Sequence, residues 1–186
     1  MNEQNPLGLL NLPSKVYRRI EEDAANVLIQ LNIRKYPVDP FQIAEGLGYI
    51  LQPYSRLPQD ALTLKIAAGI DAFSFFNPIL NKFFIYYNQE KMKERLRFTI
   101  GHEIAHIRME HRRESALAEK IADIYAAYLL APSPWIAHAK CDDYKDLAHA
   151  FCLSDSCAGI CFDRYERWKK LPHNRRYEKA LHELLS

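Results

Sequence analysis

The sequence predicts an α+β protein, in which a small, mostly antiparallel sheet packs with helices, and three observations support this. Apolar residues recur at three- and four-residue steps up to about residue 32 and again after about residue 89, which is the period of amphipathic helices. Between residues 49 and 87, short runs of Ile, Leu, Phe and Tyr alternate with Pro and Gly, which is typical of strands and turns. With 48% hydrophobic and 26% charged residues, the 186-residue chain has the composition of a folded globular protein.

The N-terminal part predicts two helices. Residues 1–13 are expected to form a loose lead-in, and Ser14 is the expected N-cap of an amphipathic helix that continues to about Asn32. A second, short helix is expected to begin at Pro40 with Asp39 as its cap, and to end at the glycines that follow.

The strand-rich stretch leads directly into a long helical segment. Its last run, residues 83–87, precedes a helix expected from about residue 89 to 111. If this run forms the sheet edge beside a cleft, it could hold a substrate in extended form by strand addition. A further helix is expected over residues 115–131 and ends at Pro132 and Pro134.

The string His102-Glu103-Ile104-Ala105-His106 places an HExxH motif in the middle of an expected helix. Residues four apart share one face of a helix, so the two imidazoles can converge on one Zn²⁺. Glu103 is rotated by about 100° from His102, where it suits a general base that takes a proton from the attacking water. The motif therefore indicates a zinc-dependent hydrolase.

A catalytic zinc needs a third protein ligand. The longer HExxHxxGxxH pattern is excluded, because Met109 and Arg112 stand where Gly and His are required and His111 is one residue out of register. A carboxylate from the next helix is the other arrangement, in which Glu119 reaches the metal and Asp123, four residues on, holds a ligand histidine, preferably the first of the motif. For Asp123 a simple ion pair or cap on the helix surface remains open.

Three stretches of the sequence resemble the ImmA/IrrE metallopeptidases: residues 97–106, 119–123 and 129–132. The resemblance implies a thermolysin-like zinc site in a small α/β domain that acts on a helix-turn-helix transcriptional repressor of the phage or mobile-element type. Cleavage would then relieve repression. By motif position, it implies His102, His106 and Glu119 as zinc ligands and Glu103 as the catalytic carboxylate.

On this basis residues 14–134 are expected to form the zinc metallopeptidase domain and residues 135–186 a C-terminal helical segment. The pattern of two short helices joined by a turn in this segment is typical of a helix-turn-helix, so a DNA-binding module is an alternative function. Asp155 and Asp163 on the second helix would repel phosphates, which makes direct nucleic-acid binding unfavourable. A non-catalytic module that only binds a repressor is a further alternative.

The remaining sequence features select no other partner. A formal net charge of +2, from 25 Lys+Arg and 23 Asp+Glu, favours neither a nucleic acid nor a membrane. The chain shows no signal peptide and no long apolar run, so a cytoplasmic location is expected. Cys141, Cys152, Cys157 and Cys161 contain no CxxC pair and are expected to be reduced thiols. The oligomeric state stays open.

Overall fold

The structure is a computed structural model that describes residues 12–186 apart from 68, 112, 114 and 174. Nearly all of the expected lead-in, residues 1–13, therefore lies outside the described residues. The helices are α1 (Ser14–Gln30), α2 (Pro40–Gly46), α3 (Gln59–Ala67), α4 (Lys93–Arg108), α5 (Ala116–Leu130), α6 (Ser133–Ala139), α7 (Tyr144–Phe151), α8 (Asp155–Trp168) and α9 (Arg176–Leu184), with a 3-10 turn at Tyr54–Arg56. The strands are β1 (Ile50–Pro53), β2 (Ala72–Asn77) and β3 (Lys82–Tyr87).

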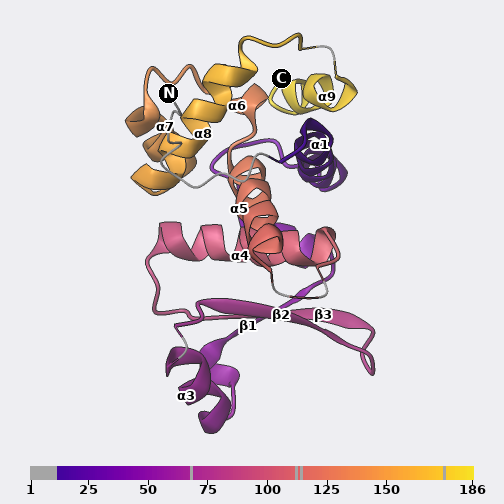
Figure 1. The fold of residues 1–186 in the computed structure, drawn as a ribbon, viewed down its shortest axis with the longest axis vertical. Helices are drawn as coiled ribbons and strands as arrows, with labels where there is room; N and C mark the ends of the chain where they lie inside the picture. The colour runs from indigo at the N-terminus through magenta and orange to yellow at the C-terminus, as the bar shows by residue number, and fades with distance from the viewer. Residues whose placement is uncertain (1–11, 68, 112, 114, 174) are drawn as a thin grey trace.

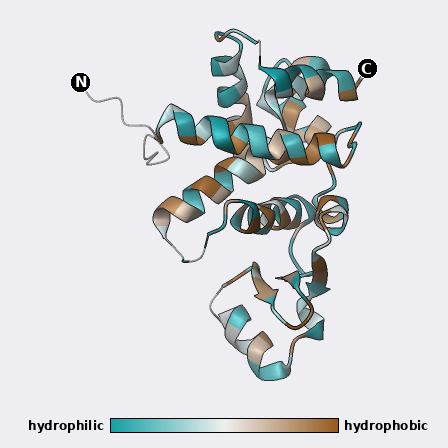
Figure 2. Cartoon of the chain, turned by 90° about the vertical axis from the view of Figure 1, so that its right-hand side faces the viewer, coloured by the Kyte–Doolittle hydropathy of each residue, from teal (hydrophilic) through white to brown (hydrophobic). Residues whose placement is uncertain are grey.

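These elements form layers, which Figure 1 shows from one side. The sheet lies between α4 and α3, and α5 packs on α4 on the side away from the sheet. Helix α1 packs on α5, and the chain ends with α9 returning to α1. Figure 2, turned by 90°, shows hydrophobic segments where the helices face one another, around one continuous core. The α+β class predicted from the sequence is confirmed.

The sheet is mixed, with the strand order β1-β3-β2. Strand β3 pairs in parallel with β1 and antiparallel with β2, so Ile85 lies between Leu51 and Ser74 and is fully buried. The condition that residues 83–87 form the sheet edge is not met, because β3 pairs with a strand on each side. Of the strands beside α4, β2 is the one that leaves an edge unpaired in the described structure.

Aromatic rings stiffen the hairpin made by β2 and β3. Across the two strands Phe73 stacks on Tyr86 and Phe75 on Phe84, each pair with ring centroids 5.4 Å apart. Cross-strand aromatic pairs of this kind stabilise a sheet by about 0.2–1 kcal/mol each. Lys65 of α3 lies 4.0 Å from the centre of the Phe73 ring, so α3 closes this face of the sheet.

The helices differ from the sequence expectations in several places, and α4 runs from Lys93 to Arg108 rather than from about residue 89 to 111. Helix α1 begins at Ser14 itself, with Pro13 in the N-cap position and no side-chain cap, whereas Asp39 caps α2 as predicted by accepting a 3.0 Å hydrogen bond from Phe41 N–H. Two helices were missed: α3, inside the stretch expected to be strands, and α6. Helix α6 starts at the proline pair expected to be a break, because Pro134 sits in the first turn, where its missing N–H costs nothing.

Asp23 ties three helices together at the end of α4. Its carboxylate accepts two hydrogen bonds from the Arg108 guanidinium, at 3.0 and 2.7 Å, and one from the Tyr125 hydroxyl at 2.7 Å. These residues come from α1, α4 and α5, and the Asp23 and Arg108 side chains are 24% and 31% exposed. The last turn of α4 is therefore fixed against both neighbouring helices.

The C-terminal segment packs into the same core as the rest of the chain. Trp135 on α6 is fully buried and donates a 2.7 Å hydrogen bond to the carbonyl of Leu181 on α9. Arg175, which precedes α9, pairs at 2.8 Å with Glu21 on α1. Contacts to α6 and α1 thus hold α9 in place. A domain boundary at residue 134 stays a prediction.

We expect Asp23→Asn to destabilise the fold by about 2 kcal/mol, because hydrogen bonds to a charged group are lost and Arg108 keeps a half-buried charge without its counter-ion. Urea unfolding measures this loss. Glu22→Gln is the matched control, since Glu22 is exposed on the same helix, and it should change the free energy of unfolding by less than about 0.5 kcal/mol. Equal unfolding free energies of the two variants would contradict the role given to Asp23.

Candidate metal centre

Helix α4 presents two imidazoles on one face. His102 and His106 are one turn apart, their Nε2 atoms are separated by 2.9 Å, and each side chain is 16% exposed. Helix α5 packs closely on α4 at this level, since a Cβ added at Gly101 would already be in van der Waals contact with the Cβ of Ala126, at 3.4 Å. A side chain of α5 can therefore share the site.

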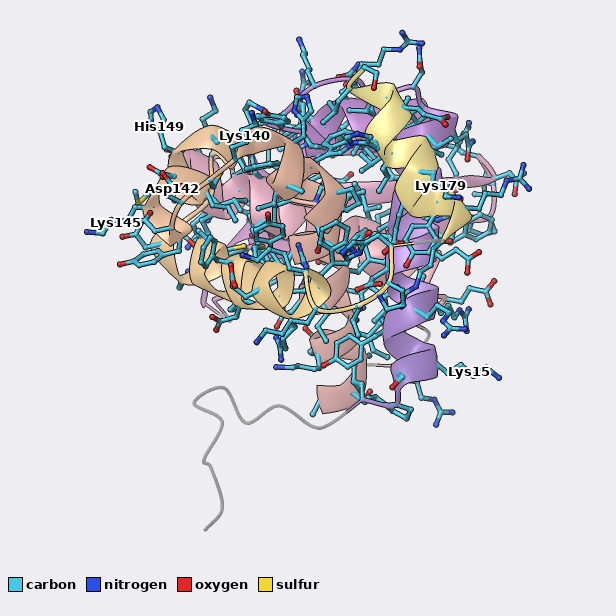
Figure 3. The ribbon with its side chains drawn as sticks, turned by 90° about the horizontal axis from the view of Figure 1, so that it is seen from above. Lys15, Lys140, Asp142, Lys145, His149 and Lys179 are labelled. Atoms are coloured by element: carbon cyan, nitrogen blue, oxygen red, sulfur yellow. The ribbon has the colours of Figure 1, made fainter. Side chains whose placement is uncertain are left out.

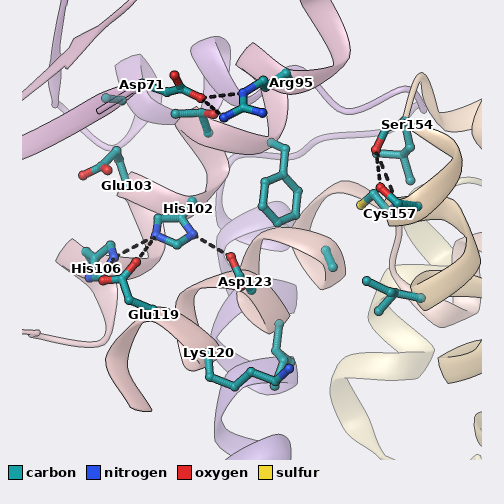
Figure 4. Close-up of a pocket in the computed structure, with 18 of the residues that line it drawn as sticks. Asp71, Arg95, His102, Glu103, His106, Glu119, Lys120, Asp123, Ser154 and Cys157 are labelled. Atoms are coloured by element: carbon teal, nitrogen blue, oxygen red, sulfur yellow. Dashed lines mark hydrogen bonds and ion pairs between the residues drawn. The ribbon is translucent and has the colours of Figure 1, made fainter. Parts of the chain in front are cut away.

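Helix α5 supplies the third donor from its first turn. Ser115 caps the helix by accepting a 3.1 Å hydrogen bond from Ala118 N–H, which sets where the helix begins. Glu119 then places Oε2 3.2 Å from Nε2 of His102 and Oε1 3.4 Å from Nε2 of His106. Figure 4 shows the three side chains pointing toward one another from the two helices.

These donor atoms have the spacing of ligands around one metal ion. One atom from each of His102, His106 and Glu119 lies within 4.8 Å of the others. Donors at about 2.0–2.1 Å from a tetrahedral ion are separated by about 3.3 Å. The two Nε2 atoms lie 2.9 Å apart, and Glu119 presents a different oxygen to each ring, Oε2 at 3.2 Å and Oε1 at 3.4 Å, so each separation lies near that value. Two imidazoles and a carboxylate also leave a fourth position open, as catalytic metal sites require, so the residues present fit such an ion.

Asp123, one turn after Glu119, contacts the first histidine on its other ring nitrogen. Its Oδ1 lies 3.0 Å from Nδ1 of His102. With Nε2 turned to the site, Nδ1 carries the proton and donates it to the carboxylate, which fixes both the tautomer and the ring orientation. His102 is the histidine that the sequence analysis favours as the partner of Asp123.

The second histidine has a partner that the sequence analysis missed. Nδ1 of His111 lies 3.1 Å from Nδ1 of His106, and the two rings meet edge to face. The sequence analysis considered His111 only as a metal ligand and rejected it, because His111 is one residue out of register with the longer zinc-binding motif. Its position directly after the helix, where a chain turns back, is the signal that could have found it.

Glu103 is buried beside this cluster, with 8% of its surface exposed. Burial raises the pKa of its carboxyl, hydrogen bonds from Ser74 on β2 and the charge of His102 lower it, and the balance is an increase. A carboxylate with a raised pKa exchanges protons more readily near neutral pH, as a general base must.

The two motif histidines differ in their affinity for protons. Burial, together with the charge of His102, lowers the pKa of His106 to about 4, so this imidazole is neutral and has a free lone pair at neutral pH. Burial lowers the pKa of His102 too, but the hydrogen bond and charge of Asp123, with further carboxylates, raise it overall. Metal ions compete with protons for these nitrogens, so binding should strengthen as the pH rises through both pKa values.

The cluster opens into a cleft of about 1660 Å³, lined by parts of α4, α5, α8 and β2. Asp71 fixes one wall, because it pairs with Arg95 and, at 2.9 Å, with Lys91, and so ties the start of β2 to the beginning of α4. Figure 4 shows the Asp71 pair above the metal-site cluster, with Ser154 and Cys157 of the α8 region across the cleft.

A second groove, of about 500 Å³, adjoins the cleft at the end of α4. Ser74, His106 and His111 line both spaces, so the cleft and the groove share a wall. The groove continues between Phe76 and Phe83 of the hairpin and α4. The aromatic side chains Phe76 and Phe83 therefore lie in a groove next to the cleft.

Two histidines one turn apart on a helix, a glutamate on the next helix and a buried carboxylate in an open cleft are the arrangement found in metal-dependent peptidases. The family model described as the IrrE N-terminal-like domain, of the M78 peptidases, matches residues 64–156, which is half of the chain and contains the whole cluster. The chain belongs to this family of ImmA/IrrE peptidases, and the resemblance stated from the sequence is confirmed. No match was found among curated proteins. Among the described residues, no helix combines the length and apolarity needed to span a membrane.

We expect the purified protein to hold about one divalent metal ion per chain, and Glu119→Gln to lose or weaken it, because only two good donors remain. Elemental analysis after dialysis against a weak chelator measures this. Lys120→Gln is the matched control, since Lys120 lines the cleft but offers no ligand in its charged form. A full metal content in Glu119→Gln would show that Glu119 is not a ligand.

Proposed function

We propose that the protein is a zinc-dependent endopeptidase that cleaves a helix-turn-helix transcriptional repressor of the phage or mobile-element type and so relieves repression. The convergence of His102, His106 and Glu119 beside the buried Glu103 is the observation that carries this proposal. Two imidazoles with one carboxylate suit zinc better than Mg²⁺ or Ca²⁺, which prefer oxygen ligands only. Membership of the ImmA/IrrE family supports the choice of a repressor as the substrate.

In the proposed peptide hydrolysis, the residues that hold the metal and the residue that transfers the proton are different. The chemistry that zinc supplies when bound is Lewis acidity, which polarises the scissile carbonyl and makes a water more acidic. Glu103 accepts the proton of the attacking water and delivers it to the leaving amine, and its burial raises the pKa of the carboxyl toward the range in which both steps work. Ser74 on β2 partly offsets this effect, because it lowers the pKa of the Glu103 carboxyl.

The edge of β2 offers the substrate a place to bind in extended form. β2 pairs with β3 on one side, whereas β3, the strand first expected at the edge, is paired on both. An unpaired edge can accept a peptide as an added strand through main-chain hydrogen bonds. A peptide lying along β2 would pass Ser74 and continue toward Phe76 in the aromatic groove.

A DNA-binding module is the alternative function. Helix α7, a turn with Cys152 in the left-handed conformation (φ 53°) and helix α8 follow one another as in a helix-turn-helix. However, α8 lines the peptidase cleft through residues such as Cys157, which leaves less of it for a DNA groove. In Figure 3 the labelled charges lie apart, with Lys145 beside Asp142 on one side and Lys179 on the other. The peptidase is therefore the better supported function.

We expect Glu103→Gln to keep its metal and bind the repressor, but to cleave it about 100- to 10,000-fold more slowly, because the amide cannot take the proton. The variant can serve as a trap that captures the repressor from cells, after which mass spectrometry follows cleavage by both proteins. Glu90→Gln, which changes an exposed carboxylate outside the cleft, is the matched control. If wild type and Glu103→Gln bind the repressor equally and neither cleaves it, the protein is a binding module.

We expect Phe76→Asp to raise KM for the repressor by about tenfold with little change in kcat, since it places a charge in the aromatic groove and leaves the metal site intact. Phe76 is already 46% exposed, so the fold should tolerate the change. Ile79→Asp is the matched control, because Ile79 is 90% exposed in the turn of the same hairpin and lines neither space. Equal KM values for the two variants would argue against a substrate path along β2.

A further inference from the structure

The end of α4 brings His111 back over the metal-site cluster. Glu110 takes the left-handed conformation (φ 56°), so the chain reverses just after the helix. The N–H of His111 donates to the carbonyl of His106 at 3.0 Å, and the N–H of Glu110 to the carbonyl of Ile107 at 3.2 Å. This pair of bonds is the Schellman pattern of helix ends. It sets residue 111 beside residue 106 through the backbone alone.

The side chains of His106 and His111 are in direct contact. The rings of His106 and His111 have centroids 5.0 Å apart, and their planes are inclined by 74°. Nδ1 of one faces Nδ1 of the other at 3.1 Å, within hydrogen-bond range. Nε2 of His106 is the nitrogen that faces the donors on the other side of its ring, Glu119 and His102.

The protons in this contact can be assigned from the ring chemistry. A hydrogen bond between two imidazole nitrogens needs one donor and one acceptor. If His106 gives the lone pair of Nε2 to a metal, its only ring proton is on Nδ1, and Nδ1 must donate. Nδ1 of His111 then accepts, and the proton of the neutral His111 ring sits on its Nε2.

We propose that His111 is a positioning residue that orients His106 for metal binding by accepting this hydrogen bond. The inference rests on the proposed metal site and deepens it, because it gives each histidine ligand its own partner: Asp123 for His102 and His111 for His106. Ligating histidines commonly need such a partner, and losing it weakens metal binding by about 10- to 100-fold.

A neutral imidazole suits this second position better than a carboxylate. Glu103, Glu119 and Asp123 already bring three acidic groups near His102. A fourth carboxylate would add repulsion between like charges within the cluster. His111 can accept the hydrogen bond without adding negative charge.

The test compares His111→Asn with His111→Leu. The amide oxygen of Asn can stand close to the position of Nδ1, whereas Leu fills similar space without an acceptor. We measure the zinc dissociation constant by competition with a chelator, and the visible absorption of the Co²⁺-loaded protein, which reports ligand geometry. We expect His111→Leu to bind zinc about 10- to 100-fold more weakly with an altered Co²⁺ spectrum, and His111→Asn to stay within about threefold of wild type.

Controls separate the possible causes. His149→Leu removes an exposed histidine of α7 and should change neither measurement. Urea unfolding of the metal-free proteins checks that the variants fold. If His111→Leu does not fold, His111→Gln takes its place, because the amide oxygen of Gln is displaced by one bond from the position of Nδ1. Wild-type affinity in His111→Leu, or equal weakening in His111→Asn, would overturn the inference. If wild type binds no metal, the proposed function itself fails, whereas unchanged binding in Glu119→Gln would show only that Glu119 is not a ligand.

Discussion

The close contact between α4 and α5 is the constraint on which the site depends. Two donors come from α4 and one from α5, so the donor atoms meet only if the helix axes approach closely. Small residues meet at this contact, where a Cβ added at Gly101 would lie 3.4 Å from the Cβ of Ala126. Packing that forced the helices apart by an ångström would lengthen the donor separations beyond the roughly 3.3 Å that a tetrahedral ion accepts. The small residues of the interface therefore decide the chemistry of the cleft.

This contact is held in place by groups that never touch the site. Asp23 clamps Arg108 and Tyr125, and so fixes the last turn of α4 to α1 and α5. The same turn carries His106 and leads into the reversal that returns His111. A carboxylate on the first helix thereby limits the motion of a histidine ligand and of its hydrogen-bond partner. If His106 binds a metal as proposed, a change that loosens this turn is expected to weaken both the fold and metal binding.

The ligand helices could be predicted from the sequence because they depend on local spacing. Residues i and i+4 share a helix face wherever the helix lies, so the HExxH motif and the pair of Glu119 and Asp123 could be recognised without the fold. The strand order could not be predicted from the sequence, because an apolar run such as residues 83–87 can lie at the centre or at the edge of a sheet. Helix α3 was hidden because its apolar residues have no clear helical stripe. His111 was missed because its contact depends on Glu110 adopting a left-handed conformation that glycine usually marks.

The walls of the cleft limit what a peptidase of this kind can cut. Helix α8 lies on one side and β2 on another, and buried Arg97 of α4, which donates to the carbonyl of Phe151 at the end of α7, holds the C-terminal segment in place. A segment that adds to β2 must offer unpaired main-chain groups, which strands inside a folded domain have already used. A compact repressor domain would therefore present a linker or a locally unfolded stretch to Ser74 and Glu103. Selectivity would then come from the accessibility of the substrate's backbone as much as from its side chains.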